Sequence, residues 1–411
     1  MCPPPGELAR PLQVASESGG ASGMAIPLIG ISAAAARLHP RLGDAVCGRG
    51  ERPLRVVAAD EAGGDVIVAD GAGGIAICPT SGRLCLDFSS DGIDFAAGVI
   101  IAHSRGAAPA GDSIASAALI GLAARVATRD VGVLIAGPTG TGKEVIARFI
   151  HTRSPRAAGP FVAVNCAAIP ETMLEATLFG FERGAFTGAT GSAPGLFRAA
   201  AKGTLLLDEV SELPLGLQAK LLRALQEHEV LPVGATVPVA IDARIIATAN
   251  RDLATEVAGG RFRADLFYRL AVFPLATISL AARRADIVPI TAALWLRQGI
   301  AAWPTSAALA KLAAHSWPGN VRELGNVVSR AAIFAEGATV GPDDIVFDLP
   351  HAMAASLVQT VRAHEQAMID STLTACDGRR SVAARRLGIS ERTLRYKLAA
   401  MHRSPGTVTL Q

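Results

Sequence analysis

The chain has 411 residues and a formal net charge of +3 at pH 7; 50% of its residues are hydrophobic but only 4% are aromatic. This length allows roughly two or three domains, with a core built largely from Ala, Val, Leu and Ile. No apolar run is long enough to span a bilayer, and residues 24–38 lack a signal peptide's basic lead and contain Pro27. We therefore expect a cytoplasmic protein that makes no membrane contact. The six scattered cysteines have no paired zinc spacing and are expected to be reduced thiols.

The positive charge is concentrated near the C-terminus. Residues 377–403 carry eight basic and two acidic side chains, 8 − 2 = +6, which leaves 3 − 6 = −3 for the rest of the chain. A short basic tail on a mildly acidic body indicates a nucleic-acid contact confined to the C-terminus.

The N-terminal part divides into two regions. Residues 1–43 are rich in Gly, Pro, Ala and Ser, and we expect a flexible leader. Residues 44–106 are expected to form a small α/β or β regulatory domain. Asp60 and Asp70 end hydrophobic runs, as in a response-regulator receiver, but the nine residues between them are too few for a receiver helix, so the domain is degenerate and we do not expect Asp70 to be phosphorylated. The strand-like runs, separated by Gly and Asp clusters, are LRVVAAD, DVIVAD, GIAICPT, RLCLDF and GVIIAH.

A linker precedes the central domain. Residues 104–113 (SRGAAPAGDS) have linker composition, and Asp112 or Ser113 is expected to cap the helix that follows. The residues expected on its inward face are Ile114, Ala118, Leu122 and Ala123.

A glycine-rich loop stands between a buried-strand run, VGVLIAG, and a helical run, VIARFIH. Strand, loop and helix in this order are the setting of a phosphate-binding loop, in which backbone N–H groups surround an anion and a lysine reaches the outer phosphates. A simple glycine turn is the alternative, and both flanks argue against it. The expected nucleotide-binding residues here are Gly137, Pro138, Thr139, Gly140, Thr141, Gly142, Lys143 and Glu144.

Polar residues end the next buried strands. FVAVN ends at Asn165, GTLLLDE at Asp208 and Glu209, and ARIIATAN at Asn250. Asp208 is placed to hold Mg²⁺ through water, and Glu209 to deprotonate the attacking water. Strands alternating with helices predict an α/β parallel sheet with helices on both faces and its sites at the carboxyl ends of the strands.

Three further candidate site residues, all arginines, follow Asn250 in the chain. Arg263 and Arg269 are candidates for reaching a phosphate bound by a neighbouring subunit, although a solvated helix face is the alternative. After a final strand, VFPL, Pro318-Gly319 breaks the chain, and Asn320 is expected to cap a helix that carries Arg322.

The segment LFGFERGAFTGA carries a glycine-flanked loop with a phenylalanine at its tip. A tight turn whose Phe186 folds into its own core is one interpretation; an apolar tip that a partner covers is the other. The loop residues are Gly184, Ala185, Phe186, Thr187, Gly188 and Ala189.

The tail, residues 356–403, is expected to be all-α. A helix over 356–375 precedes GRRSVAARRLGISERTLRYKLAAM, in which Ser381 and Ser390 cap two short helices and Gly388 makes the turn between them. This pattern predicts a helix-turn-helix that dimerises on double-stranded DNA, with an ordinary helical hairpin as the alternative. The expected DNA-binding residues are Arg385, Ser390, Glu391, Arg392, Thr393, Arg395, Tyr396 and Lys397.

In this order, GPTGTGKE, LFGFERGAFTGA, GTLLLDE, GRFRADLFYRL and WPGNVREL resemble the bacterial enhancer-binding proteins, which are AAA+ activators of sigma-54 RNA polymerase. The resemblance covers residues 112–349, with a helical lid at about 284–349, and the tail resembles their Fis-type helix-turn-helix. HTRSPRA…FVAVNCAAIPE is similar to members that control flagellar genes. The implied fold is an AAA+ P-loop ATPase.

The resemblance also implies a mechanism. Members bind enhancer-like DNA, use ATP and Mg²⁺, and assemble from dimers into hexameric rings that remodel the closed complex of the sigma-54 RNA polymerase holoenzyme. Asn165 corresponds to the switch that holds Glu209, Arg263 and Arg269 to fingers acting in trans, and Arg322 to a lid sensor. Phe186 and Thr187 fall on the sigma-factor contact.

The sequence departs from the family at several positions. A hydroxyl residue commonly precedes the sensor Asn250, but here Ala249 does, and the hydroxyl is missing unless Thr248 substitutes. Phe181 replaces a usual His. A DNA-binding repressor or co-regulator with a weak or idle ATPase is therefore the alternative function, and another AAA+ machine, such as a replication initiator, is a third.

Overall fold

The structure, a computed structural model, describes residues 29–32, 35, 42, 46, 54–58, 64–69, 74–77, 83–186, 189–335, 337–347 and 372. The chain divides into two compact units, Met1–Val346 and Phe347–Gln411. Apart from Thr372, the helix-turn-helix predicted over 356–403 and all its expected DNA-binding residues lie outside the described residues, as do Thr187 and Gly188. No described helix has the length and apolar character needed to cross a membrane.

The N-terminal domain is built on a five-stranded sheet. Its order is β1-β2-β3-β5-β4, parallel except for β4, which runs antiparallel to β5. The strands are β1 Ile29–Ile31, β2 Leu54–Ala58, β3 Val66–Ala69, β4 Gly74–Ile77 and β5 Leu84–Asp87. β2 to β5 coincide with predicted runs, whereas β1 falls within the expected leader. Ala35 and Leu42 are also fully buried, so the domain begins before residue 44.

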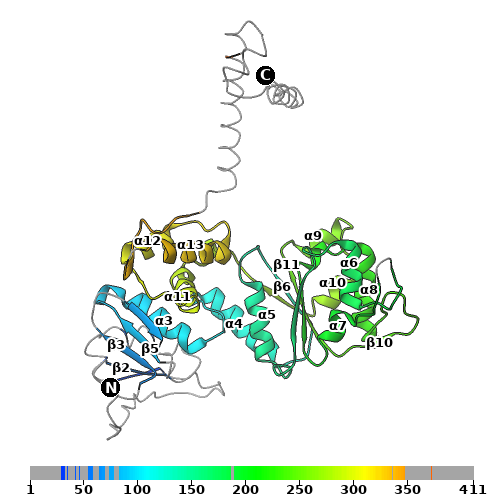
Figure 1. The fold of residues 1–411 in the computed structure, drawn as a ribbon, viewed down its shortest axis with the longest axis horizontal. Coiled ribbons are helices and arrows are strands. Elements are labelled where there is room, and N and C mark those ends of the chain that lie inside the picture. The colour runs from blue at the N-terminus through cyan, green and yellow to red at the C-terminus, as the bar shows by residue number, and fades with distance from the viewer. Residues whose placement is uncertain are drawn as a thin grey trace. The chain divides into compact units, whose positions relative to one another are not determined.

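The run GVIIAH was expected to be a strand, and this prediction was wrong. After a short 3₁₀ turn, η1 Ser90–Gly92, it forms part of helix α3 Ile93–Arg105, in which 10 of 13 residues are buried. The helix packs between β5 and the lid helix α11 Ile287–Arg297 (Figure 1). Because two partners cover it, α3 lacks the polar stripe that marks an amphipathic helix, and its apolar run imitates a buried strand.

The central domain contains the predicted parallel sheet. Its order is β12-β6-β11-β8-β7, with every pair parallel. The strands are β6 Val133–Ala136, β7 Phe161–Asn165, β8 Thr204–Asp208, β11 Arg244–Ala249 and β12 Phe273–Ala276. β6 lies between β11 and β12, where the strand order reverses, which is where doubly wound sheets bind ligands.

Helices cover both faces of this sheet (Figure 1). On one face lie α4 Ile114–Ala127 and α5 Lys143–Thr152. On the other lie α6 Glu171–Phe179, α7 Gly195–Ala199, α8 Leu215–Glu227, α9 Leu253–Ala258 and α10 Ala264–Leu270. Smaller elements are η2 Val210–Glu212 and the hairpin of β9 Glu229–Val230 and β10 Val239–Ala240.

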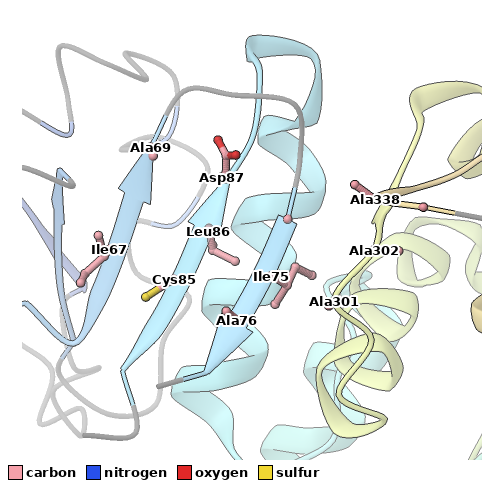
Figure 2. A pocket seen from close by; sticks show the side chains of 12 residues that line it. Ile67, Ala69, Ile75, Ala76, Cys85, Leu86, Asp87, Ala301, Ala302 and Ala338 are labelled. Atoms are coloured by element: carbon pink, nitrogen blue, oxygen red, sulfur yellow. The ribbon is translucent and has the colours of Figure 1, made fainter. Parts of the chain in front are cut away.

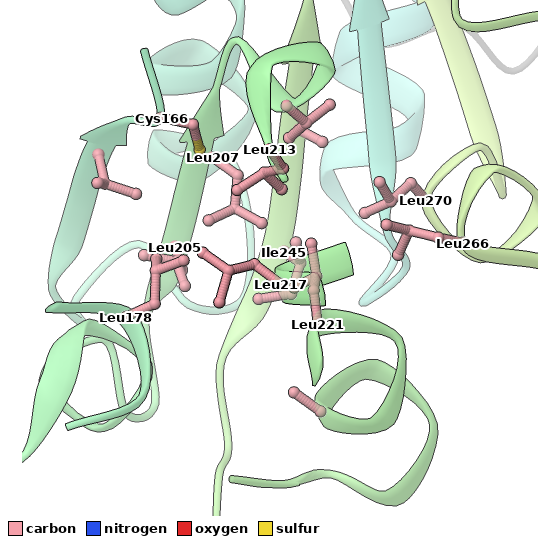
Figure 3. Packing of buried hydrophobic residues seen from close by; sticks show 14 of the residues in the cluster. Cys166, Leu178, Leu205, Leu207, Leu213, Leu217, Leu221, Ile245, Leu266 and Leu270 are labelled. Atoms are coloured by element: carbon pink, nitrogen blue, oxygen red, sulfur yellow. The ribbon is translucent and has the colours of Figure 1, made fainter. Parts of the chain in front are cut away.

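Alternation along each strand divides the core into two layers. Leu205 and Leu207 of β8 point into the layer shared with α8 and α10 (Figure 3), whereas Leu206 belongs to the layer under α4 and α5. Neighbouring residues of one strand therefore serve opposite sides of the sheet.

The inward face predicted for α4 was partly wrong. Ser113 caps the helix, accepting a hydrogen bond from the Ser116 N–H at 3.2 Å, but Ile114 is 91% exposed. The buried residues of α4 are Ser116, Ala123, Val126 and Ala127. The buried Asp286 carboxylate accepts from the hydroxyls of Ser113 and Ser116, which turns the polar side of the first turn inward.

The lid is helical, as expected. Its elements are η3 Leu280–Asp286, α11, α12 Ser306–Ala314 and α13 Asn320–Phe334, with a parallel pair of strands, β13 Trp303–Pro304 and β14 Thr339–Val340.

The lid shares an aromatic cluster with the N-terminal domain. Phe88 stacks on Trp303 at 5.6 Å between ring centroids, and Phe95 meets Trp295 and Trp303 edge-on at 5.6 and 5.2 Å. The Ile75 N–H also donates to the Ala301 carbonyl at 3.0 Å. A cavity of about 490 Å³ lies beside this contact, between β3–β5 and the lid (Figure 2). The two parts are therefore packed through side chains, beyond their connection by the chain.

Phe95→Ala is expected to lower the free energy of unfolding by about 3–5 kcal/mol, because a fully buried ring leaves a cavity between α3 and α11. Phe334→Ala is the matched control; its ring is 51% exposed on α13, so its effect is expected to stay within about 0.5 kcal/mol. Urea unfolding followed by circular dichroism measures both. Equal effects of the two changes would contradict the packing of Phe95 between α3 and the lid.

Candidate active site

The phosphate-binding loop connects β6 to α5 and requires its glycines. Gly137, Gly140 and Gly142 have φ of +142°, +77° and +98°. A Cβ on Gly137 would lie 2.2 Å from Thr277 Oγ1, and one on Gly140 would lie 2.5 Å from the Gly319 carbonyl oxygen. α5 starts without a side-chain cap, so the N–H groups of its first turn suit an anion.

Lys143 begins α5 and folds back over the loop. Its Nζ donates to the carbonyls of Gly137 at 2.7 Å and Pro138 at 3.1 Å. Burial lowers the pKa of Lys143, and the nearby charges of Asp208 and Glu209 partly offset this shift. The lysine and the two carboxylates therefore share one electrostatic environment, although they lie more than 60 residues apart in sequence.

Asp208 lies in a row of polar side chains across three strands. Asn165 is its registered partner on β7, and its Nδ2 donates to Asp208 Oδ2 at 3.2 Å. On the other side, the Thr248 hydroxyl of β11 donates to Asp208 Oδ1. Asn165 was expected to hold Glu209; here its amide contacts the preceding residue, Asp208.

Glu209 has an unusual backbone. Its φ of +57° and ψ of +49° are left-handed, a conformation that costs a non-glycine residue roughly 1–2 kcal/mol. Its N–H donates to Thr248 Oγ1 at 3.1 Å. Asn250 directly follows β11, and its Oδ1 accepts a hydrogen bond from Ser211 Oγ at 3.1 Å.

The lid meets the phosphate loop directly. The N–H groups of Val321 and Arg322 donate to the Gly140 carbonyl at 2.9 and 3.3 Å, which places the start of α13 on the loop. Asn320 was expected to cap this helix, and that prediction was wrong. Gly319 is the cap, and the Asn320 side chain instead donates to the Thr139 carbonyl at 2.9 Å and accepts from the Leu280 N–H at 2.8 Å. Asn320 thus ties the loop to two parts of the lid.

Sequence patterns missed two further features here. Buried Arg283 donates to the Thr141 carbonyl at 2.7 Å and lies 3.8 Å from Asp286. An apolar pocket opens beside the loop, lined by residues such as Pro109, Leu119 and Ile290. These residues come from the linker, α4 and α11, so no local spacing connects them. Such a pocket beside a phosphate loop suits the base of a nucleotide.

The two candidate finger arginines lie on or next to α10. Arg263 pairs with Asp265 at 2.7 Å, and Arg269 donates to the Leu225 carbonyl at 3.1 and 2.7 Å. Among the described residues, neither is hydrogen-bonded to the phosphate loop, Asp208 or Glu209.

The glycine-flanked loop stands between α6 and α7. The Gly184 N–H donates to the Ala189 carbonyl at 2.9 Å, closing the loop, and Phe181 at its base bridges Ala193 and Val233. Phe186 is 46% exposed and its ring centroid lies 5.0 Å from that of Phe181. The ring therefore does not fold into the core, and the interpretation of a tight turn with a buried Phe186 is wrong.

Three family models match the chain. The Sigma-54 interaction domain matches residues 110–276, the AAA+ ATPase lid domain residues 282–361, and the Fis family of bacterial regulatory proteins residues 360–401. The last range lies within the helix-turn-helix domain predicted over 356–403.

Similar proteins cover most of the chain. The response regulator protein FleR of Pseudomonas aeruginosa is 49% identical over 326 residues, which is 70% of this chain and 68% of FleR. The transcriptional regulatory protein FlbD of Caulobacter vibrioides is 46% identical over 305 residues, 68% of this chain and 67% of FlbD. The crystal structure of NtrX from Brucella abortus in complex with ATP has a TM-score of 0.53 and 31% identity, covering 84% of this chain and 88% of that one. The chain matches these three domain models and is 49% and 46% identical to FleR and FlbD over two thirds of their length. It therefore belongs to the sigma-54-dependent AAA+ transcriptional regulators with a Fis-type DNA-binding domain.

Proposed function

We propose that this protein hydrolyses ATP in an oligomeric ring and uses the energy to remodel closed complexes of sigma-54 RNA polymerase at promoters. It binds enhancer-like DNA through the residues predicted between Arg385 and Lys397. The observation that carries the proposal is the shared environment of Lys143, Asp208 and Glu209, with Asn165 leading from Asp208 toward the loop that carries the exposed ring of Phe186.

Lys143 and the loop N–H groups hold the phosphates of ATP, with the base in the apolar pocket beside Pro109 and Arg322 above the loop. Asp208 would hold Mg²⁺ through water. Its carboxylate accepts hydrogen bonds from two neutral side chains, Asn165 and Thr248, and lies near Lys143 of the phosphate loop. This fits Mg²⁺, which is usually held by one or two carboxylates together with phosphates and water. When bound, the ion neutralises charge that develops on the phosphates.

Glu209 takes the proton of the attacking water, and Arg263 and Arg269 reach the phosphates of the neighbouring subunit. Arg269 is exposed on α10 and Arg263 is exposed at its N-terminal cap, so a ring neighbour has access to both. Arg263 must leave Asp265 to act, which makes the ion pair an assembly-dependent contact.

Asn165 connects the site to the loop. While Nδ2 contacts Asp208, Oδ1 accepts from the N–H groups of Ala167 and Ala168 at 2.9 and 3.2 Å, in the turn before α6. α6 then packs on α7 through Phe179 and Phe197, whose rings stack at 5.6 Å. The loop connects these two helices, so a change at Asp208 that moves the turn before α6 also moves the loop.

The mixing of two inactive variants tests whether the arginines act in trans. Lys143→Ala and Arg269→Ala are each expected to lose ATPase activity, because one lacks the phosphate contact and the other the finger. In a one-to-one mixture, roughly a quarter of the head-to-tail interfaces combine an intact loop with an intact finger, so a corresponding fraction of the activity returns. A mixture that stays inactive contradicts the trans assignment.

Open-complex formation on a sigma-54 promoter, with purified protein and ATP, tests the whole proposal. Open complexes are expected with ATP and not with a non-hydrolysable analogue. DNA binding without ATP turnover would favour the alternative, a repressor or co-regulator with an idle ATPase. ATP turnover without open complexes would favour another AAA+ machine.

A further inference from the structure

The hydroxyl of Thr248 contacts both carboxylate residues of the proposed hydrolytic site. It donates to Asp208 Oδ1 and accepts from the Glu209 N–H at 3.1 Å. Thr248 is fully buried next to the last residue of β11, so its hydroxyl bonds within the protein and not to bulk water. One side chain therefore sets the orientation of the Asp208 carboxylate and fixes the left-handed backbone of Glu209.

The placement of Thr248 follows from sheet register. Ala247 pairs with Leu207, so the next residues along the two parallel strands, Thr248 and Asp208, lie side by side. Leu206 and Ile246 belong to the layer under α5, two residues before Asp208 and Thr248. Because side chains alternate along a strand, Asp208 and Thr248 point to the side of the sheet from which the phosphate loop and α5 start.

Ala249 points the other way. It belongs to the opposite layer, together with Leu207 and Ala247. A hydroxyl at position 249 would therefore project away from the side chain of Asp208. The two positions are not equivalent, and Thr248 does not simply replace a hydroxyl that is missing at 249.

We propose that Thr248 is a positioning residue for ATP hydrolysis, acting through Asp208 and Glu209. The inference rests on the proposed ATPase function. Its hydroxyl holds the Asp208 carboxylate opposite Asn165, so that both oxygens are directed, and it keeps the Glu209 backbone in a conformation that the chain would otherwise leave. Without the hydroxyl, the base samples orientations in which it does not meet the attacking water.

Thr248→Val removes the hydroxyl at nearly constant volume, and Thr248→Ser keeps it. The valine variant is expected to lower kcat for ATP about 10-fold or more, the loss expected for a hydrogen bond to a charged group, with KM changed less than about 3-fold. The serine variant is expected to stay within about 3-fold of wild type in kcat. A merely structural role would lower thermal stability without separating kcat from KM.

The double variant Thr248→Val/Ala249→Thr moves the hydroxyl by one residue and serves as the matched control. It is expected to remain as slow as Thr248→Val, because the hydroxyl now faces the opposite layer. Restored kcat in this swap, or an unchanged kcat in Thr248→Val, would overturn the proposal. Equal losses in the valine and serine variants would also overturn it.

Hydrogen–deuterium exchange of the nucleotide-free protein gives a readout that does not depend on turnover. The Glu209 amide, followed in a peptide covering residues 206–212, is expected to exchange faster in Thr248→Val than in wild type and Thr248→Ser. If wild type itself does not hydrolyse ATP, the proposed function fails and the role of Thr248 in hydrolysis fails with it, whereas the exchange comparison still tests the contact between Thr248 and Glu209. Unchanged exchange in Thr248→Val would reject the contact.

Discussion

Glu209→Gln is expected to lower ATP turnover about 10³-fold, while ATP binds nearly as well as to wild type. The amide keeps the shape of the side chain and the left-handed backbone, but it cannot accept the proton of the attacking water. Lys143 and the loop glycines, which hold the phosphates in our proposal, are untouched. Steady-state phosphate release and equilibrium binding of a fluorescent ATP analogue measure the two effects separately.

Glu212→Gln is the matched control for this change. It removes the same charge three residues further on, from a side chain that pairs with Arg251 at 3.1 Å and lies outside the Lys143–Asp208–Glu209 group. Its turnover is expected to stay within about 3-fold of wild type. Undiminished turnover in Glu209→Gln would reject Glu209 as the base.

Phe186→Ala is expected to abolish open-complex formation without lowering ATPase activity or DNA binding by more than about 2-fold. In our proposal, the exposed ring on this closed, glycine-flanked loop contacts the sigma factor, and its loss leaves the core of the domain intact. Thr187→Ala, beside it in the sequence, is expected to have the same effect. Promoter opening, ATPase rate and DNA binding are measured on the same preparation.

Phe334→Ala controls for the loss of any exposed phenylalanine, because Phe334 on α13 is 51% exposed, close to the 46% of Phe186. It is expected to open promoters normally. If Phe186→Ala still opens them, the loop is not the working contact with the sigma factor.

Local patterns were sufficient for the elements that carry the site. The five central strands are short apolar runs, three of which lead into polar residues, and glycines with positive φ mark the phosphate loop. Such signals depend on neighbouring residues only. The same reasoning failed for helix α3. Its partner α11 lies almost 200 residues away in sequence and covers the face that would otherwise be polar, so the helical periodicity is lost.

The contacts within the site depend on pairings that the sequence does not state. Alternation predicts that Thr248 and Ala249 face opposite sides, but only the register with β8 places Thr248 beside Asp208. Asn320 follows a Pro-Gly break as a cap would, yet its side chain bonds the phosphate loop, 181 residues away. In our proposal, Arg263 and Arg269 act on a nucleotide held by another subunit, and a pairing between subunits leaves no local pattern in one chain.

The aromatic cluster between the lid and the N-terminal domain has an optical consequence. The chain has three tryptophans, and all three lie in the lid: Trp295, Trp303 and Trp317. Trp295 and Trp303 touch Phe95, while Trp317 lies against His315, 4.8 Å away between ring centroids, just before α13. Tryptophan fluorescence therefore originates in the lid alone. The emission wavelength depends on the contact with the N-terminal domain through Trp295 and Trp303, and on the start of α13 at the phosphate loop through Trp317. No added label is needed.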